Sequence, residues 1–156
     1  MSDTPPTPTE TTTVCADDMV WDPESETCVK PDESSLNDDG LYEAVRELAY
    51  AGRYDGAAAA LAAMSDQADT RVLTYQGFLA RKTGDLAAAE TLYSAAIAAD
   101  PNNLLARSYY GQGLAEQGRF GEARAELSEI RRRGGRNTWP EAALVLALAS
   151  GSGPAY

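Results

Sequence analysis

The sequence predicts an all-α fold made of antiparallel helix pairs. Gly52, Gly84 and Gly118 recur at intervals of 32 and 34 residues. Each glycine is followed two positions later by a large apolar residue and five positions later by an alanine. The apolar positions after each glycine are spaced by 3, 7 and 10 residues, which places them on one face of a 3.6-residue helix. A repeated unit with one helix on each side of a glycine predicts a stack of helix pairs.

The first 37 residues are predicted to be an acidic arm, and residues 38–152 the helical domain. Residues 1–40 contain eleven acidic residues and one lysine, a net charge of −10, whereas the rest of the chain has a net charge of −1. Residues 1–13 are rich in Thr and Pro and have no periodic apolar positions, so we expect them to be disordered.

Cys15 and Cys28 are predicted to form a disulfide that closes a hairpin or loop over residues 14–30. Short apolar runs flank the turn-forming pair Asp22-Pro23. A disulfide there stabilises by about 3 kcal/mol on the loop-closure model. Two unrelated free thiols are the alternative. Paired cysteines in so small a polar segment favour an oxidising compartment, so we expect a periplasmic or secreted protein, although residues 1–13 lack the pattern of a secretion signal.

The repeated glycines are expected to end the first helix of each pair in a left-handed conformation. Asp85 follows Gly84 and can cap the next helix by accepting a backbone N–H. That helix should end at Asp100, because Pro101 pushes the preceding residue out of helical geometry.

Small residues at matching places in each pair predict a close approach of the paired helices. We expect Gly77 to face Ala89, and Gly111 to face Ala123.

Residues 138–151 are predicted to form a last helix that caps the third pair. Pro140 suits the first turn of a helix, and Gly151 suits its end. Repeat stacks require such a cap on the bare face of their last pair. The preceding run, residues 131–133, is three arginines at a helix C-terminus, where cations complement the helix dipole. A nucleic-acid-binding patch is the alternative interpretation of this run.

The segment LTYQGFLARKTGDLAAAETLYSAAIAADPNN resembles a tetratricopeptide repeat. LYEAVRELAYAGRYDGAAAALAAM and LARSYYGQGLAEQGRFGEARAELSEI resemble the copies before and after it. The resemblance covers residues 38 to about 133 and implies three repeats plus a capping helix in a right-handed superhelical stack. The first copy has Val45 in place of the first-helix glycine, and the first and third copies end without proline. Arg107 and Gln76 stand where the family has large apolar residues.

The residue types argue against catalysis. The chain has no histidine, so it has no imidazole base or His metal ligand, and we expect neither an enzyme nor a cofactor. Asp17, Asp18 and Asp22 lack the ligand spacing of an EF-hand, and two cysteines cannot complete a zinc site, so no metal is expected. The acidic arm argues against nucleic acid and anionic membranes, and no stretch approaches the roughly 20 apolar residues of a membrane span.

The resemblance implies that the first helix of each pair lines a concave groove that binds a protein or peptide. The positions carried over to this face are Tyr42, Arg46, Tyr50, Arg71, Thr74, Phe78, Arg81, Lys82, Ser108 and Gln112. Four of them are cations, which favours an extended acidic or carboxylate-ended segment as the ligand. A solvated charged surface is the alternative. The chain's own acidic arm is one candidate occupant, and a separate protein whose identity is open is the other.

A second function is suggested by the loop between the cysteines. The segment VWDPESETCV is similar to the last part of peritrophin-type chitin-binding modules, which have an aromatic residue between two cysteines. Carbohydrate or cell-surface binding through Trp21, with the repeats as scaffold, is therefore the alternative function. The structural alternative is that Trp21 packs on the disulfide or on the repeats.

Overall fold

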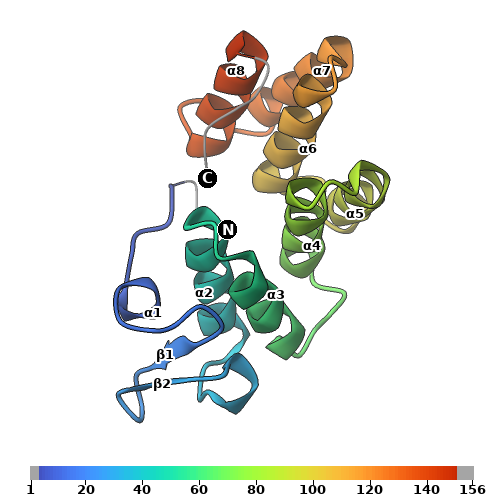
Figure 1. Ribbon diagram of the computed structural model, residues 1–156. Helices are drawn as coiled ribbons and strands as arrows, with labels where there is room; N and C mark the ends of the chain where they lie inside the picture. Colours follow the sequence, from blue (N-terminus) through green and yellow to red (C-terminus); the bar gives the residue numbers. More distant parts are fainter. Residues whose placement is uncertain (1–3, 151–156) are drawn as a thin grey trace. The chain divides into compact units, whose positions relative to one another are not determined.

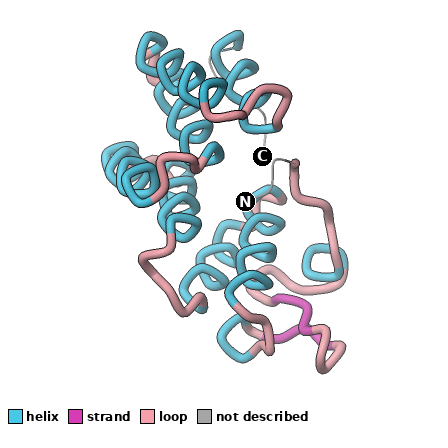
Figure 2. The backbone as a smooth tube through the Cα atoms, turned by 180° about the vertical axis from the view of Figure 1, so that it is seen from behind, coloured by secondary structure: helices cyan, strands magenta, loops and turns pink. Residues whose placement is uncertain are grey.

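The computed structural model describes residues 4–150, which group into two compact units, residues 6–68 and residues 69–150 (Figure 1, Figure 2). The first unit consists of α1 (Glu10–Thr13), β1 (Val20–Asp22), β2 (Thr27–Val29), a 3-10 turn η1 (Pro31–Glu33), α2 (Asp38–Tyr50) and α3 (Tyr54–Ala63). The second unit consists of α4 (Thr70–Lys82), α5 (Leu86–Ala99), α6 (Leu104–Glu116), α7 (Phe120–Arg132) and α8 (Trp139–Ser150).

Antiparallel helix pairs make up most of both units, which confirms the predicted fold class. Helix α2 packs on α3 in the first unit, and α4 packs on α5 and α6 on α7 in the second (Figure 1). Helix α6 also contacts α4, α5 and α8, so it lies at the centre of the second unit. Helix α8 packs on α6 and α7, as expected of a capping helix. The predicted final residue of this helix, Gly151, lies outside the described residues.

The turns within the pairs form as the sequence predicts. Gly52, Gly84 and Gly118 have φ angles of 79°, 92° and 75°, the left-handed region that only glycine adopts without strain. The Asp85 carboxylate accepts the Ala88 N–H at 3.1 Å and so caps α5. Helix α5 ends at Ala99, and the residue before Pro101 is extended.

The closest neighbours of the two helical glycines Gly77 and Gly111 are large side chains. A Cβ atom at Gly77 would lie 2.8 Å from the Tyr93 ring, and one at Gly111 would lie 2.7 Å from Leu144 of α8. The glycines therefore make room for one large side chain each. The atoms closest to these two positions thus belong to Tyr93, one turn beyond Ala89 on α5, and to the capping helix, whereas the expectation that the glycines also face Ala89 and Ala123 stays a prediction.

The acidic arm is ordered against the first helix pair, so the predicted disorder of residues 1–13 is wrong for the described part of that stretch. The Thr9 side chain caps α1 by accepting the Thr11 N–H. Thr9 also donates to the Glu47 carboxylate of α2 through its backbone N–H and, at 3.0 Å, through its hydroxyl. Glu47 is only 6% exposed, so it holds the arm from within the packed interior.

Arg53, in the turn between α2 and α3, provides a second attachment for the arm. Its guanidinium donates to the carbonyls of Thr11 and Cys15, at 3.3 and 3.2 Å, and to the carbonyl of Ala16. One side chain thus binds both the short helix α1 and the disulfide segment. The predicted domain boundary after residue 37 lies inside this unit.

The predicted disulfide joins Cys15 to Cys28. Strands β1 and β2 form an antiparallel hairpin in which Trp21 lies opposite Cys28 and Asp22 opposite Thr27. Asp22 is buried and accepts hydrogen bonds from the Glu24 N–H, at 3.1 Å, and from the Ser35 hydroxyl, and these bonds lower the pKa of its carboxyl group. The hairpin alternative is therefore the one adopted for residues 14–30.

Candidate partner-binding site

The last turn of α4 combines two cations with an aromatic face. Arg81 and Lys82 end the helix, and Phe78 lies one turn before them. The Arg81 guanidinium carbon lies 5.6 Å from the centre of the Phe78 ring and 5.8 Å from that of Tyr109 on α6. The Lys82 ammonium lies 5.5 Å from the Phe78 ring centre. These distances place both cations over aromatic rings, where cation–π attraction helps to hold them.

Arg81 is 5% exposed and only partly hydrogen-bonded. Its NH1 group donates to the Tyr109 carbonyl at 2.6 Å, and its Nε lies 3.9 Å from a Glu116 carboxylate oxygen. Among the described residues, its NH2 group is buried and has no hydrogen-bond partner. Gly113 allows this placement, because a Cβ there would lie 3.1 Å from Arg81 Cδ.

Burial and neighbouring charges act on the Lys82 ammonium group at this helix end. Burial lowers the pKa of the Lys82 ammonium group, and the neighbouring Arg81 charge lowers it further, whereas Glu116 acts in the opposite direction. Two adjacent cations thus lie at a helix end where Lys82 is partly removed from water.

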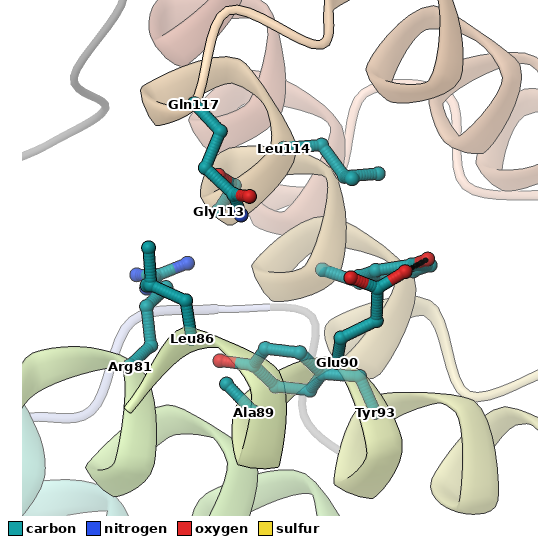
Figure 3. A pocket seen from close by; sticks show the side chains of 9 residues that line it. Arg81, Leu86, Ala89, Glu90, Tyr93, Gly113, Leu114 and Gln117 are labelled. Carbon is teal, nitrogen blue, oxygen red and sulfur yellow. Dashed lines mark hydrogen bonds between the residues drawn. The ribbon is translucent and has the colours of Figure 1, made fainter. Parts of the chain in front are cut away.

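A pocket adjoins Arg81 between α5 and α6 (Figure 3). Its walls are mainly apolar, with Arg81, Glu90 and Gln117 as polar groups at its edges; the remaining lining residues are Leu86, Ala89, Tyr93, Tyr110, Gly113 and Leu114. Figure 3 shows the Arg81 guanidinium at one end of the pocket, next to Leu86.

The predicted site residues of the first unit are mostly buried. Tyr42 and Arg46 on α2 are 3% and 4% exposed, whereas Tyr50 at the end of that helix is 42% exposed. Arg46 NH1 donates to Glu43 one turn earlier at 2.9 Å.

Two predicted positions on α4 take part in contacts within the second unit. Arg71 donates to Asp69, the residue that caps α4, through Nε and, at 2.8 Å, through NH2. The fully buried Thr74 hydroxyl donates to the Thr70 carbonyl at 2.7 Å and accepts from the Asn103 amide at 2.9 Å.

The predicted positions on α6 link that helix to the capping helix. Ser108 Oγ donates to the Pro140 carbonyl at 2.7 Å, and the Gln112 amide donates to Ser108 Oγ at 3.0 Å. Both side chains are buried. Of the predicted site residues in the second unit, Phe78, Arg81 and Lys82 are thus brought together. Thr74 and Ser108 bond to residues of neighbouring segments, and Gln112 bonds to Ser108 on its own helix.

Sequence reasoning missed the acids that pair with the predicted cations. Glu43 and Asp69 are close in sequence to Arg46 and Arg71, and a check at spacings of two to four residues would have found them. Glu116 is 35 positions from Arg81 and gives no local signal.

The remaining candidate features are the hairpin with Trp21, a metal site and a membrane-spanning helix. Trp21 is partly buried, and its backbone N–H donates to Thr11 Oγ1 at 3.1 Å. Within residues 4–150 we find neither a cluster of three or more metal-ligating side chains nor a helix with the length and apolar character needed to cross a membrane.

Helix pairs turned by left-handed glycines, with one added helix at the end, define a helical-repeat protein. Two family models, both described as tetratricopeptide repeat, match residues 42–103 and 80–149. The chain belongs to the tetratricopeptide repeat family. No curated protein and no solved structure matches it significantly. The repeats support a general role in protein interaction or as a scaffold.

Proposed function

We propose that the protein is a noncatalytic adaptor or assembly subunit that binds an extended acidic segment of a partner at the C-terminal end of α4. The partner's carboxylates lie near Arg81 and Lys82, and apolar atoms of the partner contact exposed side chains nearby. Arg71, on the same helix, remains a candidate contact of the same partner.

The observation that carries this proposal is the buried Arg81 guanidinium, whose NH2 group has no hydrogen-bond partner among the described residues, beside the partly desolvated Lys82. Burial and the adjacent cation both lower the pKa of Lys82, so the site favours any ligand that brings negative charge. Hydrogen bonds between cations and carboxylates are about twice as strong as neutral ones. A partly desolvated pair of cations on an aromatic face therefore supports acidic peptides more than neutral or basic ones.

The test compares two labelled peptides, N-acetylated and C-amidated hexaglutamate and hexaglutamine, by fluorescence anisotropy. We expect hexaglutamate to bind more tightly and to weaken as salt rises from about 50 to 200 mM, because salt screens exposed charge pairs. Lys82→Gln should weaken hexaglutamate binding about threefold to tenfold. Lys30→Gln, a charge-matched control near the hairpin, should leave it unchanged. Equal binding of both peptides by the wild-type chain would contradict the proposal.

We also propose that the protein works in an oxidising compartment, either the periplasm or outside the cell. The Cys15–Cys28 disulfide supports this location, because such bonds are rare in reducing compartments. Mass spectrometry of protein extracted from its native source under thiol-blocking conditions tests it. The proposal predicts the disulfide form, and two blocked thiols would contradict it.

A further inference from the structure

The outer face of the capping helix α8 lacks the polar character that suits the end of a repeat stack. Through its inner face, which includes the fully buried Leu144 and Ala147, α8 packs on α6 and α7 (Figure 1). The outer face is a stripe of four apolar residues at helical spacing: Ala142, Val145, Leu146 and Ala149. Repeat stacks need a polar outer face on their last element to stay soluble, and this stripe has none.

The stripe is open to solvent. Val145 and Leu146 are 40% and 48% exposed, and the two alanines are exposed as well, so no described segment covers this face. The neighbouring helix α7 is different, because its exposed positions include three charged residues: Glu122, Arg124 and Arg132. Adjacent large apolar side chains at the surface, without charges among them, are typical of an interaction surface.

Helix α8 also has no second helix of its own among the described residues. In the pairs before it, α4 packs on α5 and α6 packs on α7. The tetratricopeptide repeat model that matches residues 80–149 includes nearly all of α8. A further helix on the outer face of α8 would therefore continue the stack.

The stripe is complementary to a second copy of itself. Its residues run small, large, large, small along the helix, which is symmetric about the midpoint between Val145 and Leu146. In an antiparallel contact of two identical helices, Ala142 of one chain faces Ala149 of the other, and Val145 faces Leu146. The alanines allow a close approach at both ends, while the large side chains fill the centre. A two-fold symmetric interface requires this kind of self-complementary patch.

The charges of the second unit do not oppose such a contact. Glu141 is the one charged residue of α8, and it already accepts from Arg131 Nε at 2.7 Å and from the Asn137 N–H at 3.0 Å. The same antiparallel pairing places Glu141 opposite Ser150 of the other chain, so no like charges meet. Residues 69–150 contain nine acidic and ten basic residues, and two copies of this unit therefore repel each other little.

We propose that the outer face of α8 binds the same face of a second copy of this chain, so that the protein forms an antiparallel, two-fold symmetric dimer. The contact is short, because the twelve residues of α8 span only about 18 Å. Stable interfaces bury about 800 Å² on each partner, more than one such helix face provides. The dimer is therefore weak, with a Kd on the order of 100 µM. It does not depend on the proposed binding of an acidic segment.

Sedimentation velocity of the full chain at about 5 and about 500 µM tests the dimer. We expect monomer at the lower concentration and mostly dimer at the higher one. Leu146→Glu places like charges at the centre of the contact and should weaken self-association about tenfold or more. Ala125→Glu, which adds the same charge at an exposed position on α7, should leave it unchanged. Circular dichroism melts check that both variants fold.

Two results would overturn the proposal. A wild-type chain that stays monomeric at about 500 µM would leave the face to a helix of another protein. Equal self-association of Leu146→Glu and Ala125→Glu would place the contact elsewhere on the chain.

Cysteine crosslinking tests the antiparallel register. Ala142→Cys and Ala149→Cys are oxidised separately and as a mixture, with the Cys15–Cys28 disulfide intact, and crosslinked dimers are measured on non-reducing gels. We expect most crosslinking in the mixture. Equivalent positions of the two chains lie about 10 Å apart along the helix axis in this register, which is farther than a disulfide spans. More crosslinking in the separate samples than in the mixture would overturn the antiparallel dimer.

Discussion

At the scale of single residues, the glycines of this chain have two different tasks. Gly52, Gly84 and Gly118 supply the left-handed turns. Gly77 and Gly111 lie inside helices, where each leaves space for one large side chain from a neighbouring helix. Protein interiors are close-packed, so an added methyl group at such a position must displace atoms of the neighbouring helix.

Gly77→Ala tests this packing. The new Cβ would lie 2.8 Å from the Tyr93 ring, and overpacking costs about 1–3 kcal/mol, more than the 0.5–1 kcal/mol that alanine gains in a helix. We expect a lower free energy of unfolding in urea. Gly121→Ala is the matched control: a Cβ at Gly121 has no neighbour within 4 Å, so this variant should be more stable than wild type by about 0.5–1 kcal/mol. A stabilised Gly77→Ala variant would show that α4 and α5 are not in close contact.

Glu141 makes stability depend on pH at the start of the capping helix. Its carboxylate accepts from Arg131 Nε at 2.7 Å and from the Asn137 N–H at 3.0 Å, and these bonds lower its pKa below the ordinary value of 4.5. A group whose pKa is lower in the folded state stabilises the fold above its unfolded pKa. That contribution is lost as the pH falls below about 4.5 through the folded pKa.

Glu141→Gln should therefore lower the Tm at pH 7 by about 2–4 °C and reduce the further loss of Tm between about pH 5 and pH 3. Thermal melts followed by circular dichroism across that range measure both effects. Glu122→Gln removes an exposed partner of Arg119 and should change the Tm little. Parallel pH profiles for Glu141→Gln and the wild type would contradict the assignment.

At the scale of elements, the first helix pair packs against a small disulfide module, which consists of α1 and the hairpin of β1 and β2. The module is attached by polar contacts of Glu47 and Arg53 to backbone groups of residues 9–16. It also packs closely, because a Cβ at Gly56 of α3 would lie 2.2 Å from the Asp17 carbonyl. The module therefore covers part of the first repeat with backbone and a short hairpin, whereas α8 covers the last repeat with a full helix.

Arg53→Met keeps the apolar stem of the side chain but removes its hydrogen bonds to the module. We expect a loss of about 2–3 kcal/mol, because three carbonyls, two of them in partly buried contacts, lose a charged donor. Urea unfolding followed by Trp21 fluorescence, with Trp139 replaced by Phe in every variant, measures it. Arg124→Met, at an exposed position on α7, controls for the loss of a charge. An unchanged midpoint for Arg53→Met would show that the turn arginine does not hold the module.

How far the sequence predicts each element depends on how local its causes are. The glycine turns, the Asp85 cap and the end of α5 before Pro101 depend on neighbouring residues, and all were predictable. The order of the arm was not, because its contacts join Thr9 to Glu47 and Cys15 to Arg53, each 38 positions away. The burial of Arg81 beneath Gly113 was hidden for the same reason. A glycine in a helix indicates a close approach, but not which side chain approaches.

At the scale of the whole molecule, the charge is divided unevenly between the units. Residues 1–68 contain fifteen acidic and three basic residues, whereas residues 69–150 contain nine acidic and ten basic ones. The strong overall negative charge therefore does not describe the part of the chain that carries the candidate site. We therefore expect an acidic partner of the proposed kind to be repelled by the net charge of the first unit at long range and attracted by the cations at the end of α4 at short range.

Neutralising exposed acids of the hairpin region tests this long-range term. The combined variant Asp18→Asn, Glu24→Gln and Glu26→Gln should raise the association rate of hexaglutamate a few-fold at low salt. The difference should vanish near 1 M salt, where the screening length falls to about 3 Å. Stopped-flow anisotropy measures both rates. A rate increase that persists at high salt would instead favour the prediction that the acidic arm itself occupies the site.

The central claim, that an acidic partner binds at the end of α4, is tested most directly by chemical-shift mapping. Unlabelled hexaglutamate is titrated into the ¹⁵N-labelled chain, and the backbone amide shifts are assigned to residues. The account predicts that the largest shifts occur at residues 78–90 and around Gly113. Shifts confined to residues 14–30, the hairpin that carries Trp21, or no shifts at saturating peptide, would contradict it.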